Sequence, residues 1–341
     1  MVAMATRKEH IMKKLVALLL TLVVLATSCL AFTGCTGDNP SGGGNPGKTT
    51  FKVGVCQLVQ HPALDQATQG FIDALKAELG AENVEIDVQN ASGDANACTT
   101  IVNKFKSSRV DLVMANATPA LNAAFTTIED IPILGTSITE YGVALGIENF
   151  SGVSGMNVSG TSDLAPLDEQ ANMILELCPN VKSVGILYCA SEKNSEYQVK
   201  VVKQILEQNN VTVTEFKFTD STNVKAFAEA AASQCDALYV PTDNVVALCA
   251  EIIGEVVREH GKPLFAGEEN VAKSCGVASL TISYYDLGVT TGKMAAKILK
   301  GEADVSKMPI EYATPTKKYN KEMCTLLGIT IPENAGYQEI E

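Results

Sequence analysis

The sequence predicts an α/β protein of two lobes, each built on a doubly wound parallel sheet, with a hinge between them. Short β-branched segments alternate with amphipathic helical segments, which is the pattern of parallel sheets covered by helices. The length of 341 residues suits two domains of about 100 to 200 residues each. The two halves also repeat each other, because three strand-like segments align between them: 53–55 with 184–186, 112–114 with 238–240, and 132–134 with 263–265.

The expected strands share short runs of aliphatic and β-branched residues, and they are 51–56, 84–88, 111–115, 131–135, 184–188, 211–216, 237–240, 263–266 and 278–282. Apolar residues at three- and four-residue spacing predict helices over 71–79, 224–235 and 245–256, and a further helix is expected over 287–299. Ligands of open α/β sheets bind outside the carboxyl ends of the strands. The strand-to-helix loops are therefore the expected site.

The first residues predict export from the cytoplasm. Lys13 and Lys14 precede an apolar run over 15–26, which is long enough for a signal-peptide core and too short to span a bilayer comfortably. The small residues just before Cys35 resemble the bacterial lipobox read by lipoprotein signal peptidase. This resemblance implies that Cys35 becomes a lipid-bearing N-terminus.

Alternatives stay open at this end of the chain. An ordinary cleaved signal peptide would leave Cys35 incidental, Cys29 is a weaker rival acceptor, and translation could begin at Met12. The expected organisation is a signal peptide over 1–34, a flexible tether over 35–50, a first lobe of 51–160 plus 286–314, and a second lobe of 161–285 plus 315–341. The expected crossings between the lobes are near 156–164, 283–286 and 312–317.

Charge and cysteine spacing exclude several classes of function. A net charge of −13 argues against nucleic acid or anionic lipid as a partner. The eight cysteines beyond Cys29 and Cys35 show no C-x-x-C spacing, which argues against zinc, although one disulfide stays open. No nucleophile elbow, P-loop or full dinucleotide fingerprint occurs. No metal, cofactor or enzymatic activity is therefore expected.

Four loop segments resemble one family of binding proteins. They are Gln57 to Asp65, the T-P-A turn at 118–120, the E-x-N-S segment at 192–195 and the P-x-D-N segment at 241–244. In this order they resemble the tryptophan/tyrosine-type ABC transporter substrate-binding proteins, which are two-lobed lipoproteins with a type I periplasmic-binding-protein-like fold. The chain departs from the family at 138–141, where it has I-T-E-Y in place of V-T-D-P. That departure leaves the identity of the ligand open.

Three acids are candidates to bind an α-ammonium group, because a charge enclosed in a desolvated cleft needs a partner of opposite sign. Asp243 is preferred, since it directly follows a strand and belongs to the family motif, and Glu140 and Glu268 are the other options. The helix expected to open at Asp65 offers free backbone N–H groups to an α-carboxylate. The other helix-start residues, Thr118, Asn194, Ser195 and Asn244, could bind ligand or act only as helix caps.

Tyrosines near strand ends, namely Tyr141, Tyr188, Tyr284 and Tyr285, could form an apolar wall for the ligand's side chain. The chain has no Trp, the residue that sugar sites often stack against their ligand, and this favours an amino acid. The full set of expected ligand-binding residues is Gln57, His61, Asp65, Thr118, Pro119, Thr139, Glu140, Tyr141, Asn194, Ser195, Asp243, Asn244, Glu268 and Tyr284.

These observations lead to one expected function and its rivals. We expect a monomeric, lipid-anchored, extracytoplasmic binding protein that captures a small ligand, with an apolar or aromatic amino acid favoured. The resemblance implies ABC permease and ATPase subunits as partners. A ligand-presenting subunit of a signalling system, or a protein for a sugar or nucleoside, remains an alternative. Sequence alone does not separate them.

The anchoring expectation has a direct test. If Cys35 carries the lipid, Cys35→Ser should release the protein from the membrane fraction or leave it unprocessed, because the diacylglyceryl group then has no attachment site. Fractionation and the mass of the processed protein measure this. Unchanged processing and membrane association in the variant would contradict the lipoprotein expectation.

Overall fold

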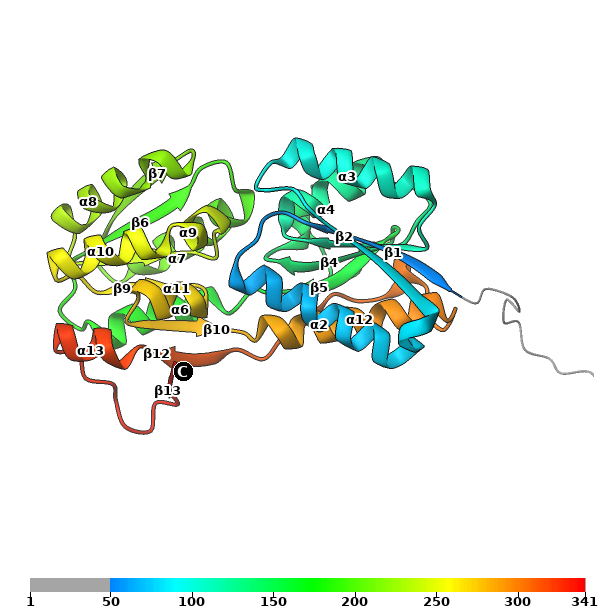
Figure 1. The fold of residues 1–341 in the computed structure, drawn as a ribbon. Coiled ribbons are helices and arrows are strands. Elements are labelled where there is room, and N and C mark those ends of the chain that lie inside the picture. The colour runs from blue at the N-terminus through cyan, green and yellow to red at the C-terminus, as the bar shows by residue number, and fades with distance from the viewer. Residues whose placement is uncertain (1–49, 341) are drawn as a thin grey trace, which may run out of the picture. The chain divides into compact units, whose positions relative to one another are not determined.

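Two β-sheets form the frame of residues 50–340, the part of the chain that the computed structural model describes (Figure 1). The expected signal segment and tether, with Cys29 and Cys35, lie outside the described residues. Within 50–340, no helix has both the length and the apolarity needed to cross a membrane.

The first sheet has six strands, in the order β11 (Glu311–Tyr312), β5 (Val158–Ser162), β4 (Ile133–Ile138), β3 (Leu112–Asn116), β1 (Phe51–Gln57) and β2 (Val84–Asn90). All of its strand pairs are parallel. The second sheet has seven strands, in the order β13 (Gln338–Glu339), β12 (Thr316–Tyr319), β10 (Ala278–Thr281), β9 (Leu264–Ala266), β8 (Ala237–Val240), β6 (Ser183–Cys189) and β7 (Thr212–Phe218). Only its β10–β12 pair is antiparallel.

Helices cover both sheets. Around the first sheet lie α2 (Pro62–Leu79), α3 (Ala95–Ser108), α4 (Thr118–Thr127), α5 (Tyr141–Leu145) and α12 (Tyr284–Leu299). Around the second lie α6 (Leu167–Leu177), α7 (Lys193–Gln208), α8 (Val224–Gln234), α9 (Asn244–Leu248), α10 (Ala250–His260), α11 (Glu269–Cys275) and α13 (Lys321–Leu327). Short 3₁₀ turns occur at Ala81–Asn83, Ser221–Asn223 and Val305–Lys307. The predicted fold class, two α/β lobes with parallel sheets, is confirmed.

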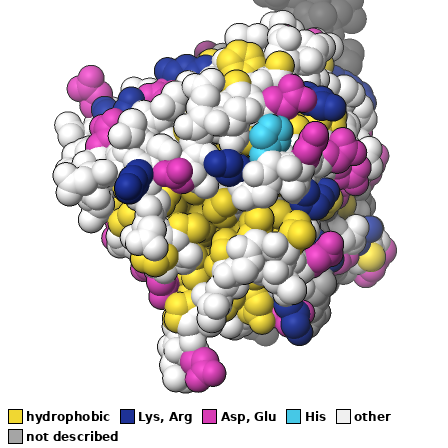
Figure 2. Space-filling model, turned by 90° about the vertical axis from the view of Figure 1, so that its left-hand side faces the viewer, with side chains coloured by type: hydrophobic (Ala, Val, Ile, Leu, Met, Phe, Trp, Pro, Cys, Tyr) yellow, Lys and Arg dark blue, Asp and Glu magenta, His cyan; other side chains and the backbone are white. Residues whose placement is uncertain are grey.

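Each lobe has its own hydrophobic core. The first sheet carries separate apolar clusters, one that includes Phe105 of α3 and another that includes Phe71 of α2 and Met294 of α12. The second lobe has one large cluster. Figure 2 faces the end of this lobe and shows apolar side chains gathered in its lower middle, with acidic and basic side chains scattered singly around them. No charge of one sign dominates that face.

Two expected elements differ from the structure. The predicted helix over 245–256 is two helices, α9 and α10, which meet at Cys249. The segment 156–164, expected as a crossing, contains strand β5. Its sequence V-S-G-T-S has only one aliphatic residue, so the sequence pattern did not predict a strand there. Its polar side chains are satisfied by neighbours instead: Ser159 donates to the Met308 carbonyl at 3.0 Å, and the hydroxyls of Thr161 and Thr291 lie 2.9 Å apart.

The chain passes between the sheets after β5, after β10 and after β11. Since β5 pairs with β4 as far as Ser162, the first sheet extends past residue 160. The lobe boundaries expected from the sequence stay a prediction.

Glycines let α2 and α12 approach closely in the first lobe, where the blue and orange helices lie side by side (Figure 1). A Cβ added at Gly288 would lie 2.0 Å from the Ala67 carbonyl oxygen, and one at Gly70 would lie 2.1 Å from that of Tyr285. Both contacts are with backbone atoms, which cannot rotate away as a side chain could. Helix α12, which follows the second crossing, is therefore packed tightly against the first lobe.

We expect Gly288→Ala to destabilise the protein by about 2 kcal/mol, because overpacking must push two helix backbones apart and outweighs the helix propensity that Ala gains. Chemical denaturation measures the change. Lys293→Ala, at an exposed position of the same helix, is the control and should stay within about 0.5 kcal/mol. Equal stability of the two variants would show that the helix contact is not tight.

Candidate functional site

A small cavity lies between the two lobes, at the carboxyl ends of strands from both sheets. Its volume is about 20 Å³, which is room for roughly one water molecule. It is lined by His61, Leu64, Thr118, Ser137, Thr139, Asp163, Asn194, Thr242, Asp243, Asn244, Ala247, Glu268 and Tyr284. The first lobe, the second lobe and the crossing segments all contribute to this lining.

The structure brings eight of the fourteen expected residues to this cavity: His61, Thr118, Thr139, Asn194, Asp243, Asn244, Glu268 and Tyr284. The other six lie elsewhere: Gln57, Asp65, Pro119, Glu140, Tyr141 and Ser195. Each of the six has a local reason for its position.

Gln57 and Asp65 bond to each other inside the first lobe. Gln57 Nε2 donates to Asp65 Oδ1 at 2.7 Å and to the Val59 carbonyl at 2.8 Å, while its Oε1 accepts from the Thr68 hydroxyl at 2.6 Å. The sequence suggested that Asp65 opens the helix, and this prediction is wrong. Helix α2 begins at Pro62, because a proline needs no N–H partner in the first turn.

Tyr141 and Glu140 face away from the cavity. The Tyr141 hydroxyl donates to the Thr161 carbonyl at 3.1 Å inside the first lobe, and its ring stacks on Phe150 at 6.3 Å. Glu140 caps helix α5 by accepting from the N–H groups of Gly142 and Val143. It lines a separate open depression of about 550 Å³.

Asp243 is both part of the cavity wall and a helix cap. Its Oδ1 accepts from the Val245 and Val246 N–H groups at 3.0 and 2.9 Å. Its Oδ2 accepts from the Cys189 N–H at 2.8 Å and from the Ser195 hydroxyl at 2.7 Å. Burial raises the pKa of Asp243. Ser195 is fully buried behind Asp243, so it supports that acid and does not reach the cavity.

Glu192, behind the cavity wall of the second lobe, accepts hydrogen bonds from two asparagines that line the cavity. Its Oε2 accepts from Asn194 Nδ2 at 3.0 Å and from Asn244 Nδ2 at 2.8 Å. Burial, followed by the neighbouring charge of Asp243, raises the pKa of Glu192. Glu192 was expected only as part of the E-x-N-S motif, yet it orients two asparagines of the cavity. Pro119 lies nearby, in a shallow cavity of about 330 Å³ that also touches Thr118 and Asn194.

A hydrogen bond joins the lobes directly across the cleft. His61 Nε2 lies 3.3 Å from Asn244 Oδ1, and the His61 side chain is buried. Burial lowers the pKa of His61, and the bond to Asn244 partly opposes this shift. The neutral ring with its proton on Nε2 fits this contact, since Asn244 Oδ1 can only accept.

Sequence reasoning missed Asp163, which is buried at the crossing after β5. The Tyr284 hydroxyl donates to its Oδ2 at 2.9 Å. Burial raises the pKa of Asp163 to about 6, and the bond from Tyr284 opposes that rise. Because β5 was not recognised as a strand, the residue at its carboxyl end was not seen as a site candidate. Ser137 and Thr242 were also missed.

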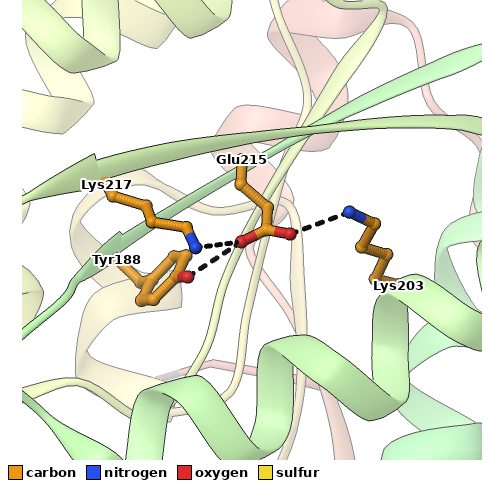
Figure 3. Close-up of polar contacts among 4 residues, drawn as sticks. All are labelled: Tyr188, Lys203, Glu215 and Lys217. Atoms are coloured by element: carbon orange, nitrogen blue, oxygen red, sulfur yellow. Dashed lines mark hydrogen bonds and ion pairs between the residues drawn. The ribbon is translucent and has the colours of Figure 1, made fainter.

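Three of the four tyrosines considered for an apolar wall lie outside the cavity: Tyr141, described above, Tyr188 and Tyr285. Tyr188 donates its hydroxyl to Glu215 at 2.9 Å, and Glu215 is also paired with Lys203 and Lys217 at 2.8 and 2.9 Å (Figure 3). These lysines, together with Tyr188, hold the pKa of Glu215 at about 2 despite partial burial. Tyr285 is half exposed and bonds to Asp73 at 3.1 Å.

Groups that could hold a metal are absent from residues 50–340: no three His, Cys, Asp or Glu side chains gather suitably. The eight cysteines in this range are free thiols.

Two sheet-based lobes with a polar cavity between them are the architecture of two-lobed, hinged binding proteins. Residues 52–338 match the family described as ABC transporter substrate binding protein, and the chain belongs to this family. The family is one of substrate-binding proteins, which work outside the cytoplasm and are not enzymes.

Relatives of known name or structure cover most of the chain. A tyrosine-binding protein of Clostridioides difficile strain R20291 is 35% identical over 305 residues, 87% of each chain. An ABC domain from Streptococcus pneumonia, solved in complex with L-Trp, is 33% identical, with a TM-score of 0.81 over 86% of this chain and 100% of that one. A ligand-free, open substrate-binding protein with adhesive properties from Clostridium difficile is 36% identical, with a TM-score of 0.67 over 86% and 99%.

Asp243→Ala should destabilise the protein by about 3 kcal/mol, since four donors would lose this acceptor and three of them have buried hydrogen bonds to it. Chemical denaturation without added ligand measures this. The control is Asp168→Ala, an exposed acid in the first turn of α6, which should change stability by about 0.5 kcal/mol or less. An unchanged stability of Asp243→Ala would mean that the cap contributes little.

Proposed function

We propose that this protein is the extracytoplasmic solute-binding lipoprotein of an ABC importer and that it captures an α-amino acid with an aromatic or apolar side chain. Cys35 would carry the lipid anchor, and permease and ATPase subunits would receive the ligand. Family membership supports the importer role. The tyrosine-binding relative and the L-Trp complex support the ligand class.

The observation that carries the proposal is the set of buried polar atoms left without a partner at the cavity. Ser137 Oγ, Asp163 Oδ1 and Asn194 Oδ1 have no hydrogen-bond partner among residues 50–340, and all three residues line the cavity. Buried polar atoms normally have partners, because an unmade hydrogen bond costs about 1 to 3 kcal/mol. A polar ligand between the lobes would satisfy all three.

The lobes are in a closed arrangement, which explains the small volume of the cavity. The bond between His61 and Asn244 spans the cleft. The structure also matches the L-Trp complex better than the open, ligand-free relative, with TM-scores of 0.81 and 0.67, although the open relative is slightly more identical in sequence. An amino acid is far larger than one water molecule, so the lobes must lie further apart than this both when the ligand enters and while it is bound.

In the proposed complex, the first lobe contributes His61, Thr118 and Thr139, and the second contributes Asn194, Asn244 and Glu268. Leu64 and Ala247 are apolar and could contact the ligand's side chain. Because both lobes touch the ligand, ligand binding would favour the closed state over the open one.

A thermal-shift screen of the purified domain against amino acids, sugars and nucleosides tests this function. L-tyrosine or L-tryptophan should raise the melting temperature, since a ligand at about 100 times its Kd adds about 2.7 kcal/mol of stability. Calorimetry on each positive compound gives the Kd. A screen in which only sugars or nucleosides stabilise the domain would refute the proposed ligand class.

A further inference from the structure

We propose that Asp163, held by Tyr284, is the carboxylate that binds the ligand's α-ammonium group. This inference rests on the proposed function, because it assigns one residue of the same site to one group of an α-amino acid. It also moves this role away from Asp243, the residue that the sequence favoured.

The three acids that line the cavity differ in how many more hydrogen bonds their oxygens can accept. Asp243 already accepts four hydrogen bonds, which is about all that the two oxygens of a carboxylate can accept. Glu268 accepts from the backbone N–H groups of Asn270 and Val271 and from the Asn270 side chain, as the cap of α11. Asp163 Oδ2 accepts from the Tyr284 hydroxyl, and a side-chain hydrogen bond from Thr139 also lowers the pKa of Asp163. Its Oδ1 has no hydrogen-bond partner in the described chain.

Asn194 presents a second free acceptor to the cavity. Asn194 Nδ2 donates to Glu192 Oε2 and to the Thr242 carbonyl, both at 3.0 Å. This orientation leaves Asn194 Oδ1 as a buried acceptor at the cavity. Asp163 Oδ1 and Asn194 Oδ1 therefore both need a donor. An ammonium group has three N–H donors and no acceptor, which matches a pair of acceptors.

The charged side chains that line the cavity are all acidic. Asp163, Asp243 and Glu268 line the cavity, whereas no Lys or Arg from the described residues does. A buried cation is stable only beside a carboxylate, and a buried carboxylate gains most from a cation that meets its free oxygen. The wall therefore favours the cationic end of an amino acid at Asp163.

The position of Asp163 in the chain adds a consequence for closure. Asp163 follows β5, and Tyr284 begins α12, so their hydrogen bond joins two of the crossings between the lobes. Asn194 belongs to the second lobe. An ammonium group shared by Asp163 and Asn194 would tie the crossing region to the second lobe in the closed state.

The test is calorimetry with L-tyrosine and L-tryptophan on the wild type, Asp163→Asn and the control Asp168→Asn, at about pH 7.5, where a carboxyl of pKa about 6 is ionised. Asp163→Asn should weaken binding of the amino acids by roughly thirtyfold or more, because the ammonium loses its charged partner. Asp168→Asn, which removes an exposed charge, should bind like the wild type.

Deaminated analogues separate ammonium recognition from a general loss of structure. The wild type should bind 3-(4-hydroxyphenyl)propanoate at least about tenfold more weakly than L-tyrosine, whereas Asp163→Asn should bind this analogue no more weakly than the wild type does. If Asp163→Asn does not fold, the wild-type comparison alone still tests whether the ammonium group is recognised at all. Equal wild-type affinity for L-tyrosine and its analogue would overturn the inference.

The failures of the two proposals are distinguishable. If the wild type binds neither amino acid, this result contradicts the proposed function and the inference that rests on it. If the wild type binds L-tyrosine or L-tryptophan and Asp163→Asn binds it equally well, only the role of Asp163 is wrong.

Discussion

Buried carboxylates hold the loops that form the cavity, and most of the site depends on them. Asp243 and Glu268 each cap a short helix at the carboxyl end of a strand, and Glu140 does the same beside the cavity. The N–H groups at a helix start have no partner within the helix, so a buried helix start needs an acceptor from a side chain. An acid in such a loop therefore stabilises the loop first, whatever it does for a ligand.

This constraint separates acids that shape the site from acids that can bind within it. Asp243 belongs to the family motif, follows a strand and is buried, and all three features favour it as a ligand contact. Its carboxylate, however, already accepts four hydrogen bonds, which join β6, α7 and α9. Asp163 caps no helix and keeps one oxygen free. Counting the partners of each oxygen thus ranks the two acids in the reverse of the order that the sequence suggests.

The crossings between the lobes combine rigid and adjustable contacts. Helix α12 is packed on α2 with almost no space between their backbones, so it moves with the first lobe. The contacts across the cleft include the polar one between His61 and Asn244. A protein built this way can open between the lobes while each lobe keeps its core.

By itself, the sequence determined the class of fold and most of the strands, because β-branched runs and helical spacing are local patterns that burial on a sheet requires. It also placed eight cavity residues, since strand-to-helix loops of parallel sheets meet at one edge. Only the tertiary structure decided that V-S-G-T-S is a strand, that Tyr141 and Tyr188 point away from the cavity, and that Asp163 faces it. These outcomes depend on which hydrogen-bond partners distant segments supply, and residue types along the chain do not contain that information.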